Sequence, residues 1–233
     1  MIQFFITGTS SGIGYQLAMQ ALDQGHKVVG ISRRHVIDHP NYRHLSYNLS
    51  SYENYKLIHF NINKEAQKVV LVNNAGWLGE VKPAGQISPQ AIARAFQINL
   101  VAPSILCKLF IEQTQPLASE KVIINISSGA AKYAVPSWST YCASKAGIDL
   151  FTKVLREDHP EIYSFSIAPG IVDTEMQGEI RRLDENDFPE IQRFVDYKEK
   201  GELSAPSDVA ASLLKIIDRP ETAPDSVFSL RDL

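Results

Sequence analysis

Short apolar runs alternate along the chain with longer segments of helical periodicity. Runs rich in branched apolar residues predict strands at residues 2–6, 27–31, 68–72, 121–126 and 162–167. Apolar positions at helical spacing, such as Leu17, Ala18, Ala21 and Leu22, predict a helix over residues 13–24, and longer helices follow at 88–115 and 139–157. This alternation favours an α/β fold, in which helices cover both faces of a parallel sheet.

One segment interrupts the alternation. Residues 175–204 are charged, contain Pro189 and two glycines, and lack a strand pattern. They follow the turn at Pro169 and Gly170, which ends a predicted strand. Ligands of open α/β sheets bind at the carboxyl ends of the strands, and a polar insertion of this length in a compact domain is usually functional. We therefore expect residues 175–204 to form a substrate lid.

The stretch TGTSSGIG, residues 7–14, joins the first strand to the first helix. Gly8 permits a tight turn, and Gly12 and Gly14 let the backbone approach a pyrophosphate at the helix N-terminus. A glycine-rich turn with a purely structural role is the alternative. The loop and the sheet pattern together predict a single Rossmann-type, doubly wound domain over residues 1–233. The loop residues expected to bind a dinucleotide are Gly8, Ser10, Ser11, Gly12, Ile13 and Gly14.

The residues after the second strand bear on the choice of dinucleotide. A site for NAD carries an acid there, about 20 residues beyond the glycine loop, for the ribose 2′-hydroxyl. This chain has Ser32, Arg33 and Arg34 instead, with no acid before Asp38. Because an arginine pair can bind a 2′-phosphate, the sequence favours NADP(H), with NAD(H) as the alternative. The alternative is that Arg33 and Arg34 are solvated surface residues that bind no ligand.

Charge and composition argue against several other classes. The chain has 23 Lys and Arg against 26 Asp and Glu, a net charge of −3, so we expect no nucleic-acid partner and no attraction to an anionic membrane. The two cysteines and six histidines show no metal-ligand spacing, so no metal is expected. The N-terminal residues resemble neither a signal sequence nor a membrane span. A cytoplasmic location is therefore the expectation.

Further motifs follow the glycine loop in a fixed order. NNAG occupies residues 73–76, Asn99 lies within INLVAP, and ISS ends at Ser128. Tyr141 precedes Lys145 by four positions, and PGIVDT occupies residues 169–174. With these motifs and the wider TGxxxGxG spacing of the loop, nearly the whole chain resembles the short-chain dehydrogenase/reductase family.

The resemblance implies a catalytic set. In this family a tyrosine gives a proton to the substrate carbonyl, while a lysine lowers its pKa and holds the nicotinamide ribose. Tyr141 and Lys145 match these positions and share one helix face, where a nearby ammonium favours the phenolate. Ser128 would bind the substrate oxygen, and Asn99 would hold a water that links Lys145 to solvent. A buried tyrosine and lysine with only structural hydrogen bonds is the alternative.

The resemblance also extends the expected cofactor site. After the third strand the family usually has Asp and then an apolar residue, whereas this chain has Asn48 and Leu49. The segment from Asn48 to the next strand is short, which predicts a reduced helix on that face. The further cofactor-binding residues that the resemblance implies are Asn48, Leu49, Asn73, Ala75, Gly76, Tyr141, Lys145, Pro169, Gly170, Val172 and Thr174.

Residues 137–142 narrow the expected substrate. They resemble the branch of sepiapterin reductases and bacterial benzil reductases, which reduce a carbonyl beside another carbonyl or an imine-like centre. With Ser128 and Tyr141, Trp138 would line the substrate side, or it would pack on the lid. Ser229 aligns with the acid that anchors the pterin in sepiapterin reductases, with Asp232 nearby. A dicarbonyl substrate is therefore favoured over a pterin.

The helix that begins near Asn99 is apolar on more than one side, which indicates burial on more than one side. The resemblance implies that this helix and the Tyr–Lys helix pair two copies into a homodimer. The sequence thus predicts an NADPH-dependent carbonyl reductase that acts on a small ketone or dicarbonyl. Two alternatives stay open: a dinucleotide-binding sensor or scaffold without turnover, and an NAD-linked alcohol dehydrogenase.

Overall fold

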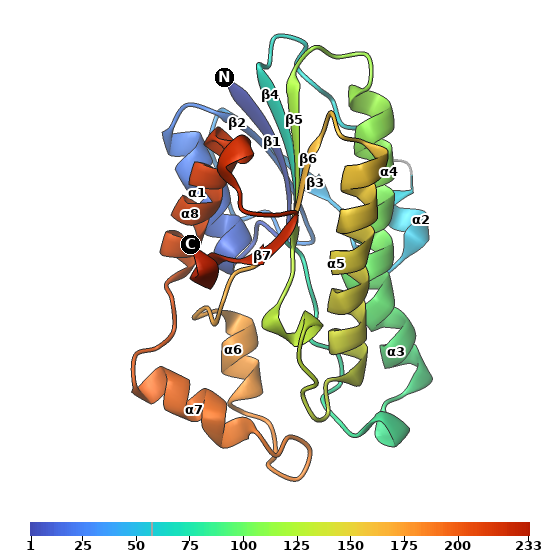
Figure 1. The fold of residues 1–233 in the computed structure, drawn as a ribbon, viewed down its shortest axis with the longest axis vertical. Coiled ribbons are helices and arrows are strands. Elements are labelled where there is room, and N and C mark those ends of the chain that lie inside the picture. Colours follow the sequence, from blue (N-terminus) through green and yellow to red (C-terminus); the bar gives the residue numbers. More distant parts are fainter. Residues whose placement is uncertain (57) are drawn as a thin grey trace.

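The computed structural model describes residues 1–56 and 58–233, and its centre is a seven-stranded sheet of order β3-β2-β1-β4-β5-β6-β7 (Figure 1). Every strand pair is parallel. The strands are β1 (Ile2–Thr7), β2 (Lys27–Ser32), β3 (Tyr42–Ser46), β4 (Lys68–Asn73), β5 (Glu120–Ile126), β6 (Tyr163–Ala168) and β7 (Val227–Ser229). The predicted doubly wound parallel fold is confirmed, and β3 and β7 are strands that the apolar pattern did not predict.

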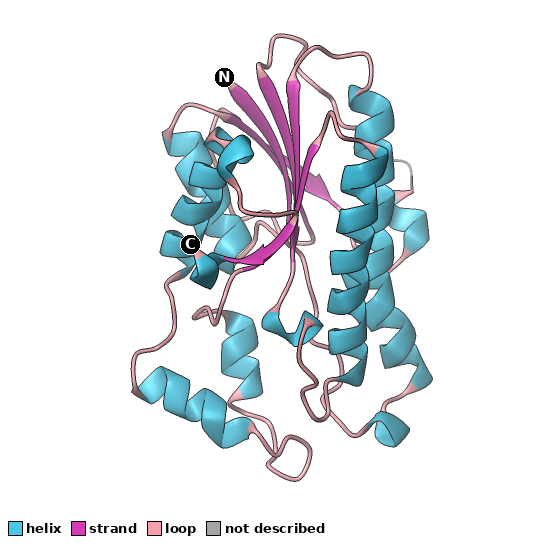
Figure 2. Ribbon diagram, viewed as in Figure 1, coloured by secondary structure: helices cyan, strands magenta, loops and turns pink. Residues whose placement is uncertain are grey.

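Helices cover the sheet on both sides (Figure 2). One face carries α1 (Gly12–Asp23) and α8 (Pro206–Asp218), and the other carries α3 (Pro89–Phe96), α4 (Ala102–Thr114) and α5 (Ser139–Asp158). Side chains of β1 alternate between the two cores: Phe4 and Ile6 pack toward α1 and α8, and Phe5 packs toward α4. Double coverage explains why the central strands are apolar without alternation.

Two helical regions differ from regular helices. The predicted helix at 88–115 contains a π-helical turn, Gln97–Val101, between α3 and α4. Between β3 and β4, α2 (Tyr52–Tyr55) is a single turn, which agrees with the reduced helix expected there.

The run Pro89–Thr114 alone among the described residues has the length and apolar composition of a membrane span. In this fold it is a core helix, with Ala102, Leu106 and Phe110 fully buried.

The segment after β6 lies beyond the carboxyl ends of the strands, at the lower left of Figure 1. It contains α6 (Glu175–Ile180) and α7 (Ile191–Glu199), and a parallel bridge between Val172 and Ser204 closes its base. Lys198 on α7 donates to Asp173 Oδ2 at 2.6 Å, which ties α7 to the start of the segment. The remaining elements are the 3-10 turns η1 (Ala84–Gln86), η3 (Gly129–Ala131), η4 (Pro220–Thr222) and η5 (Leu230–Asp232).

Candidate active site

A cavity of about 950 Å³ opens at the carboxyl edge of the sheet. Its walls come from the glycine loop, the ends of β2, β4, β5 and β6, the first half of α5, the helices α6 and α7, and the C-terminal turn η5. The strand order reverses between β1 and β4 at this edge, which is where open α/β sheets bind their ligands.

The glycine loop is shaped by close backbone contacts. Gly8 has a φ of +75°, a conformation that favours glycine. A Cβ on Gly14 would lie 2.4 Å from Asn74 Nδ2 and 2.5 Å from the Gly8 carbonyl oxygen, so no side chain fits there. Ser11 caps α1 with extended backbone and without a side-chain hydrogen bond. The first N–H groups of α1 are therefore available to an anion at the positive end of the helix dipole.

The end of β2 presents two exposed arginines to the same cavity. The Ser32 hydroxyl donates to the Arg34 carbonyl oxygen at 2.8 Å, which fixes the turn that carries Arg33 and Arg34. Arg34 Nη2 lies 4.0 Å from Glu175 Oε2 at the start of α6, and both side chains are mostly exposed. An exposed pair of this kind contributes little energy, so it leaves Arg34 free to bind a phosphate.

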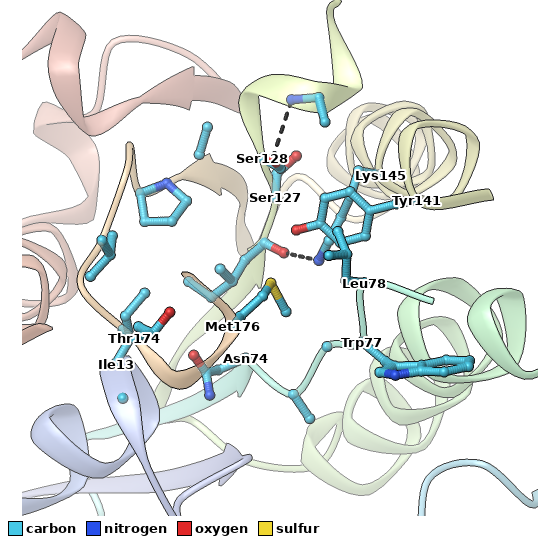
Figure 3. A pocket seen from close by; sticks show the side chains of 18 of the residues that line it. Ile13, Asn74, Trp77, Leu78, Ser127, Ser128, Tyr141, Lys145, Thr174 and Met176 are labelled. Carbon is cyan, nitrogen blue, oxygen red and sulfur yellow. Dashed lines mark hydrogen bonds between the residues drawn. The ribbon is translucent and has the colours of Figure 1, made fainter. Parts of the chain in front are cut away.

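Tyr141, Lys145 and Ser128 meet at the centre of the cavity (Figure 3). The tyrosine hydroxyl points into the cavity, while Lys145 Nζ donates to the Ile126 carbonyl oxygen at 2.7 Å. Ser128 lies just beyond β5, where its Oγ also accepts from the Ala130 N–H at 3.2 Å. Strand and helix thus place a phenol, a hydroxyl and an ammonium together, as the spacing of the motifs predicts.

The pKa values of the two ionisable groups differ from the simple expectation. Burial raises the pKa of Tyr141 to about 12, and the hydrogen bond with Ser128 opposes this rise. Burial lowers the pKa of Lys145 to about 8, against the raising effect of the Asp149 charge. Desolvation is the largest influence on the pKa of Tyr141, and Lys145 Nζ lies 5.7 Å from the tyrosine ring centroid. The expected lowering of the phenol pKa by Lys145 is not found in this arrangement.

Asn99 lies in the π-helical turn and is buried. Its Oδ1 accepts from the Trp77 N–H at 2.9 Å, and its Nδ2 donates to the Trp77 carbonyl at 2.8 Å and to Ser144 Oγ at 3.2 Å. A Cβ on Gly76 would lie 3.6 Å from Asn99 Oδ1 and 3.7 Å from Lys145 Nζ. The bare glycine therefore leaves a space between the two polar atoms. π-Turns of this kind often occur at functional sites.

Most of the predicted site residues line the cavity. Those that do are Gly8, Ser10, Ser11, Gly12, Ile13, Ser32, Arg33, Arg34, Asn48, Leu49, Ala75, Gly76, Ser128, Trp138, Tyr141, Lys145, Pro169, Gly170, Val172 and Thr174. Gly14, Asn73 and Asn99 are not among the lining residues.

Asn73 is directed into the core instead of the cavity. Its Nδ2 donates to Asn125 Oδ1 at 2.8 Å, so it joins β4 to β5 beneath α4. The next residue, Asn74, lines the cavity and donates from Nδ2 to the Thr7 carbonyl oxygen at 2.9 Å. Asn73 is the last residue of β4, so strand alternation turns its side chain toward α4 and the core. Asn74 follows the strand, and its side chain reaches the cavity in place of Asn73.

Aromatic side chains join the segment 175–204 to the start of α5. The Trp138 ring stacks on Phe188 of this segment, with 5.3 Å between ring centroids, and meets Tyr141 edge-on at 5.6 Å. Phe194 on α7 lies 5.4 Å from both Trp138 and Phe188. Trp138 therefore both packs on residues of the segment 175–204 and lines the cavity. The sequence reasoning missed Phe188 and Phe194, although aromatic residues within a charged segment were a signal for them.

The geometry thus defines a parallel α/β protein of the nucleotide-binding class. A family model for short chain dehydrogenases matches residues 3–185. The chain is 34% identical over 226 residues to benzil reductase ((S)-benzoin forming) of Bacillus subtilis (strain 168), with 93% of each chain covered. The chain belongs to the short-chain dehydrogenase/reductase family. It is therefore an oxidoreductase for carbonyl or hydroxyl groups that uses a nicotinamide dinucleotide.

Two further comparisons fit this family. Sepiapterin reductase of Xenopus tropicalis is 33% identical over 158 residues, which cover 66% of this chain and 58% of that protein. The crystal structure of the KRED1-Pglu enzyme matches with a TM-score of 0.82 and 26% identity, over 98% of this chain and 100% of that one.

Proposed function

We propose that the protein is an NADPH-dependent carbonyl reductase for a small ketone or dicarbonyl, with Tyr141 as the proton donor. The observation that carries this proposal is the convergence of the buried Tyr141 and Lys145 side chains with Ser128 on one cavity at the carboxyl edge of the sheet. The Tyr141 hydroxyl points into this cavity, where it could give its proton to the oxygen of a bound carbonyl compound (Figure 3). Arg33 and Arg34 at the cavity wall argue against the alternative of an NAD-linked alcohol dehydrogenase, because an arginine pair suits the 2′-phosphate of NADPH.

The reaction follows from the placement of the side chains. The cofactor supplies the hydride when bound, and the N-terminus of α1 with the glycine loop would hold its pyrophosphate. Ser128 and Tyr141 would both donate hydrogen bonds to the substrate oxygen and so stabilise the developing alkoxide. The Tyr141 proton then passes to that oxygen, and the Lys145 charge stabilises the phenolate that remains. A water in the space beside Gly76, held by Asn99, would return a proton from solvent.

The substrate side of the cavity favours an apolar carbonyl compound. Trp138, Leu78 and the lid residue Met176 line it, and Phe188 supports Trp138 from behind. The similar Bacillus subtilis protein is described as a benzil reductase that forms (S)-benzoin, which is the reduction of one carbonyl of an aromatic diketone. We therefore place a dicarbonyl first among the substrates and assign residues 175–204 the role of a lid over it.

A cofactor-oxidation assay tests this function. The protein is mixed with NADPH or NADH and, in turn, with benzil, an aliphatic diketone, an aldehyde and a pterin ketone, while absorbance of the reduced nicotinamide is followed. We expect turnover with NADPH on at least one dicarbonyl. Tight NADPH binding without turnover on any of the four would contradict the reductase and support the sensor alternative.

We further propose that two copies associate through α4 and α5. Val101 precedes α4, and Leu150 and Val154 lie one turn apart on α5 with 65% and 52% of their surfaces exposed. These side chains form an apolar stripe on the outer helical face, and burial in a dimer would remove it from water. A cytoplasmic location and the absence of a nucleic-acid partner stay predictions.

Light scattering after size-exclusion chromatography tests the dimer. We expect a mass of twice the 26.0 kDa chain for the wild type and a monomer for the double variant Leu150→Glu, Val154→Glu, because two buried charges oppose association. Tyr52→Glu, an equally exposed apolar position on α2, is the control and should remain dimeric. A wild-type monomer at micromolar concentration would refute the interface.

A further inference from the structure

A third ionisable residue lies in line with the catalytic pair on α5. Tyr141, Lys145 and Asp149 occupy positions i, i+4 and i+8 of this helix, so they share one face. All three line the same cavity. The reaction described above gives a role to the first two and none to Asp149.

The carboxylate of Asp149 is held in place from the sheet. Ser166 on β6 is fully buried, and its hydroxyl donates to Asp149 Oδ1 at 2.6 Å. Ser166 pairs in register with Asn125 on β5, whose side chain donates to Thr152 on α5 at 2.9 Å. The side chains at this register therefore face α5, and a short hydrogen bond from a rigid strand limits the positions of the carboxylate.

Among the described residues, the buried ammonium of Lys145 has no charged hydrogen-bond partner, so a negative charge nearby would favour its protonated form. Its acceptor is the Ile126 carbonyl oxygen, which is neutral, and only 5% of the residue is exposed. Burial disfavours the charged amine and lowers its pKa, while Asp149 raises it. An ammonium that loses its proton near neutral pH would stop stabilising the Tyr141 phenolate.

Other ionisable side chains surround this face of α5. On the packed elements they are Arg94 of α3, Cys107 of α4, and Arg231 and Asp232 of η5, and across the cavity they are Arg33, Arg34, Lys132, Tyr133, Glu175, Glu179, Glu190, Arg193 and Tyr197. Ser127, which follows β5, and Ser166 on β6 also line the cavity wall. Of the described charged groups, Asp149 lies one helical turn from Lys145 on the same face of α5, and its charge raises the pKa of Lys145 against the effect of burial.

We propose that Asp149 is a positioning residue that acts through Lys145: its carboxylate, fixed by Ser166, keeps the buried ammonium protonated one helical turn away. The link from Asp149 to Lys145 is a property of the protein alone. Its consequence for proton donation by Tyr141 rests on the proposed function. The carboxylate then extends to higher pH the range over which the enzyme works.

The first test observes Lys145 without any substrate. Protein labelled with ¹³C at lysine Cε is titrated by NMR, and the signal missing from Lys145→Arg identifies Lys145. We expect a titration midpoint near pH 8 in the wild type. In Asp149→Asn the midpoint should fall by about one pH unit, the order of magnitude for two charges one helical turn apart at an intermediate dielectric constant.

Matched variants separate charge from structure. Asp149→Glu keeps the charge and should keep the midpoint, and Glu157→Gln removes an exposed carboxylate from the same helix and should leave the midpoint unchanged. Ser166→Ala frees the carboxylate and should lower the midpoint by less than Asp149→Asn, which provides a test even if Asp149→Asn does not fold. An unchanged midpoint in both variants would overturn the proposal and leave Asp149 a structural role.

The second test uses the reaction. With NADPH and the best carbonyl substrate, the alkaline limb of the kcat profile should move to lower pH in Asp149→Asn by the same amount as the NMR midpoint. A moved midpoint with an unmoved limb would overturn the link to Tyr141. A moved midpoint in a protein that reduces no carbonyl would contradict the proposed function and leave the link between Asp149 and Lys145 intact.

Discussion

Replacing Tyr141 by Phe should lower kcat for carbonyl reduction by about 10²–10⁴-fold, the contribution of a positioned general acid. The ring would still pack edge-on against Trp138, which lies 5.6 Å away. The substitution removes the hydroxyl that points into the cavity (Figure 3) and leaves the apolar contacts in place. The expected change is therefore in kcat, with little change in the thermal unfolding temperature.

Cofactor binding is the control for this variant. The dissociation constant for NADPH, followed by nicotinamide fluorescence, should stay within about threefold of the wild type, because Lys145 and the glycine loop are unchanged. A Tyr141→Phe protein that keeps more than a tenth of the wild-type kcat would show that another group gives the proton. Ser128, which lines the cavity beside Tyr141, would then be the next residue to replace.

The positions of these groups could be predicted from the sequence, but their pKa values could not. Helical periodicity was enough to place Tyr141 and Lys145 on one face. Burial is a property of the whole fold, and it raises the pKa of Tyr141 while it lowers that of Lys145. Both shifts result from tertiary packing, which the spacing of residues along one helix does not predict.

The main strands could be predicted because both faces of the sheet are buried. Runs such as residues 68–72 are apolar throughout, which corresponds to β4 with Val69, Val70, Leu71 and Val72 fully buried. β7 has only three residues, paired with β6 at one edge. So short a run produces no periodic signal, and its place depends on long-range pairing.

Two features of the site could not be predicted from the sequence because they depend on the course of the backbone. The π-helical turn at Gln97–Val101 adds a residue to a helical turn without a distinct signature in the sequence. Asn73 and Asn74 are identical residues, and only the end of β4 decides that Asn74 reaches the cavity and Asn73 the core. Asp149 was missed for a related reason, since its partner Ser166 is on another element.

Replacing both Arg33 and Arg34 by Ala should reduce kcat/KM with NADPH by about 10–100-fold and change the value with NADH by less than about threefold. Each arginine can form a charge-assisted hydrogen bond to a 2′-phosphate, worth about 1.5–3 kcal/mol before screening. Both are exposed at the cavity wall, so solvent reduces this contribution. The loss should appear mainly in KM, because the adenosine end of the cofactor takes no part in the chemical step.

Measurements at several ionic strengths and on matched variants test whether Arg33 and Arg34 select NADPH through its 2′-phosphate. The preference for NADPH should narrow as ionic strength rises, since exposed charges are screened. Lys215→Ala with Arg219→Ala removes the same charge from the exposed end of α8 and should leave both cofactors unaffected. Glu175→Gln, which frees Arg34 from its 4.0 Å neighbour, should lower KM for NADPH slightly. Equal losses with NADPH and NADH in the double arginine variant would show that these residues support the loop after β2 and do not select the phosphate.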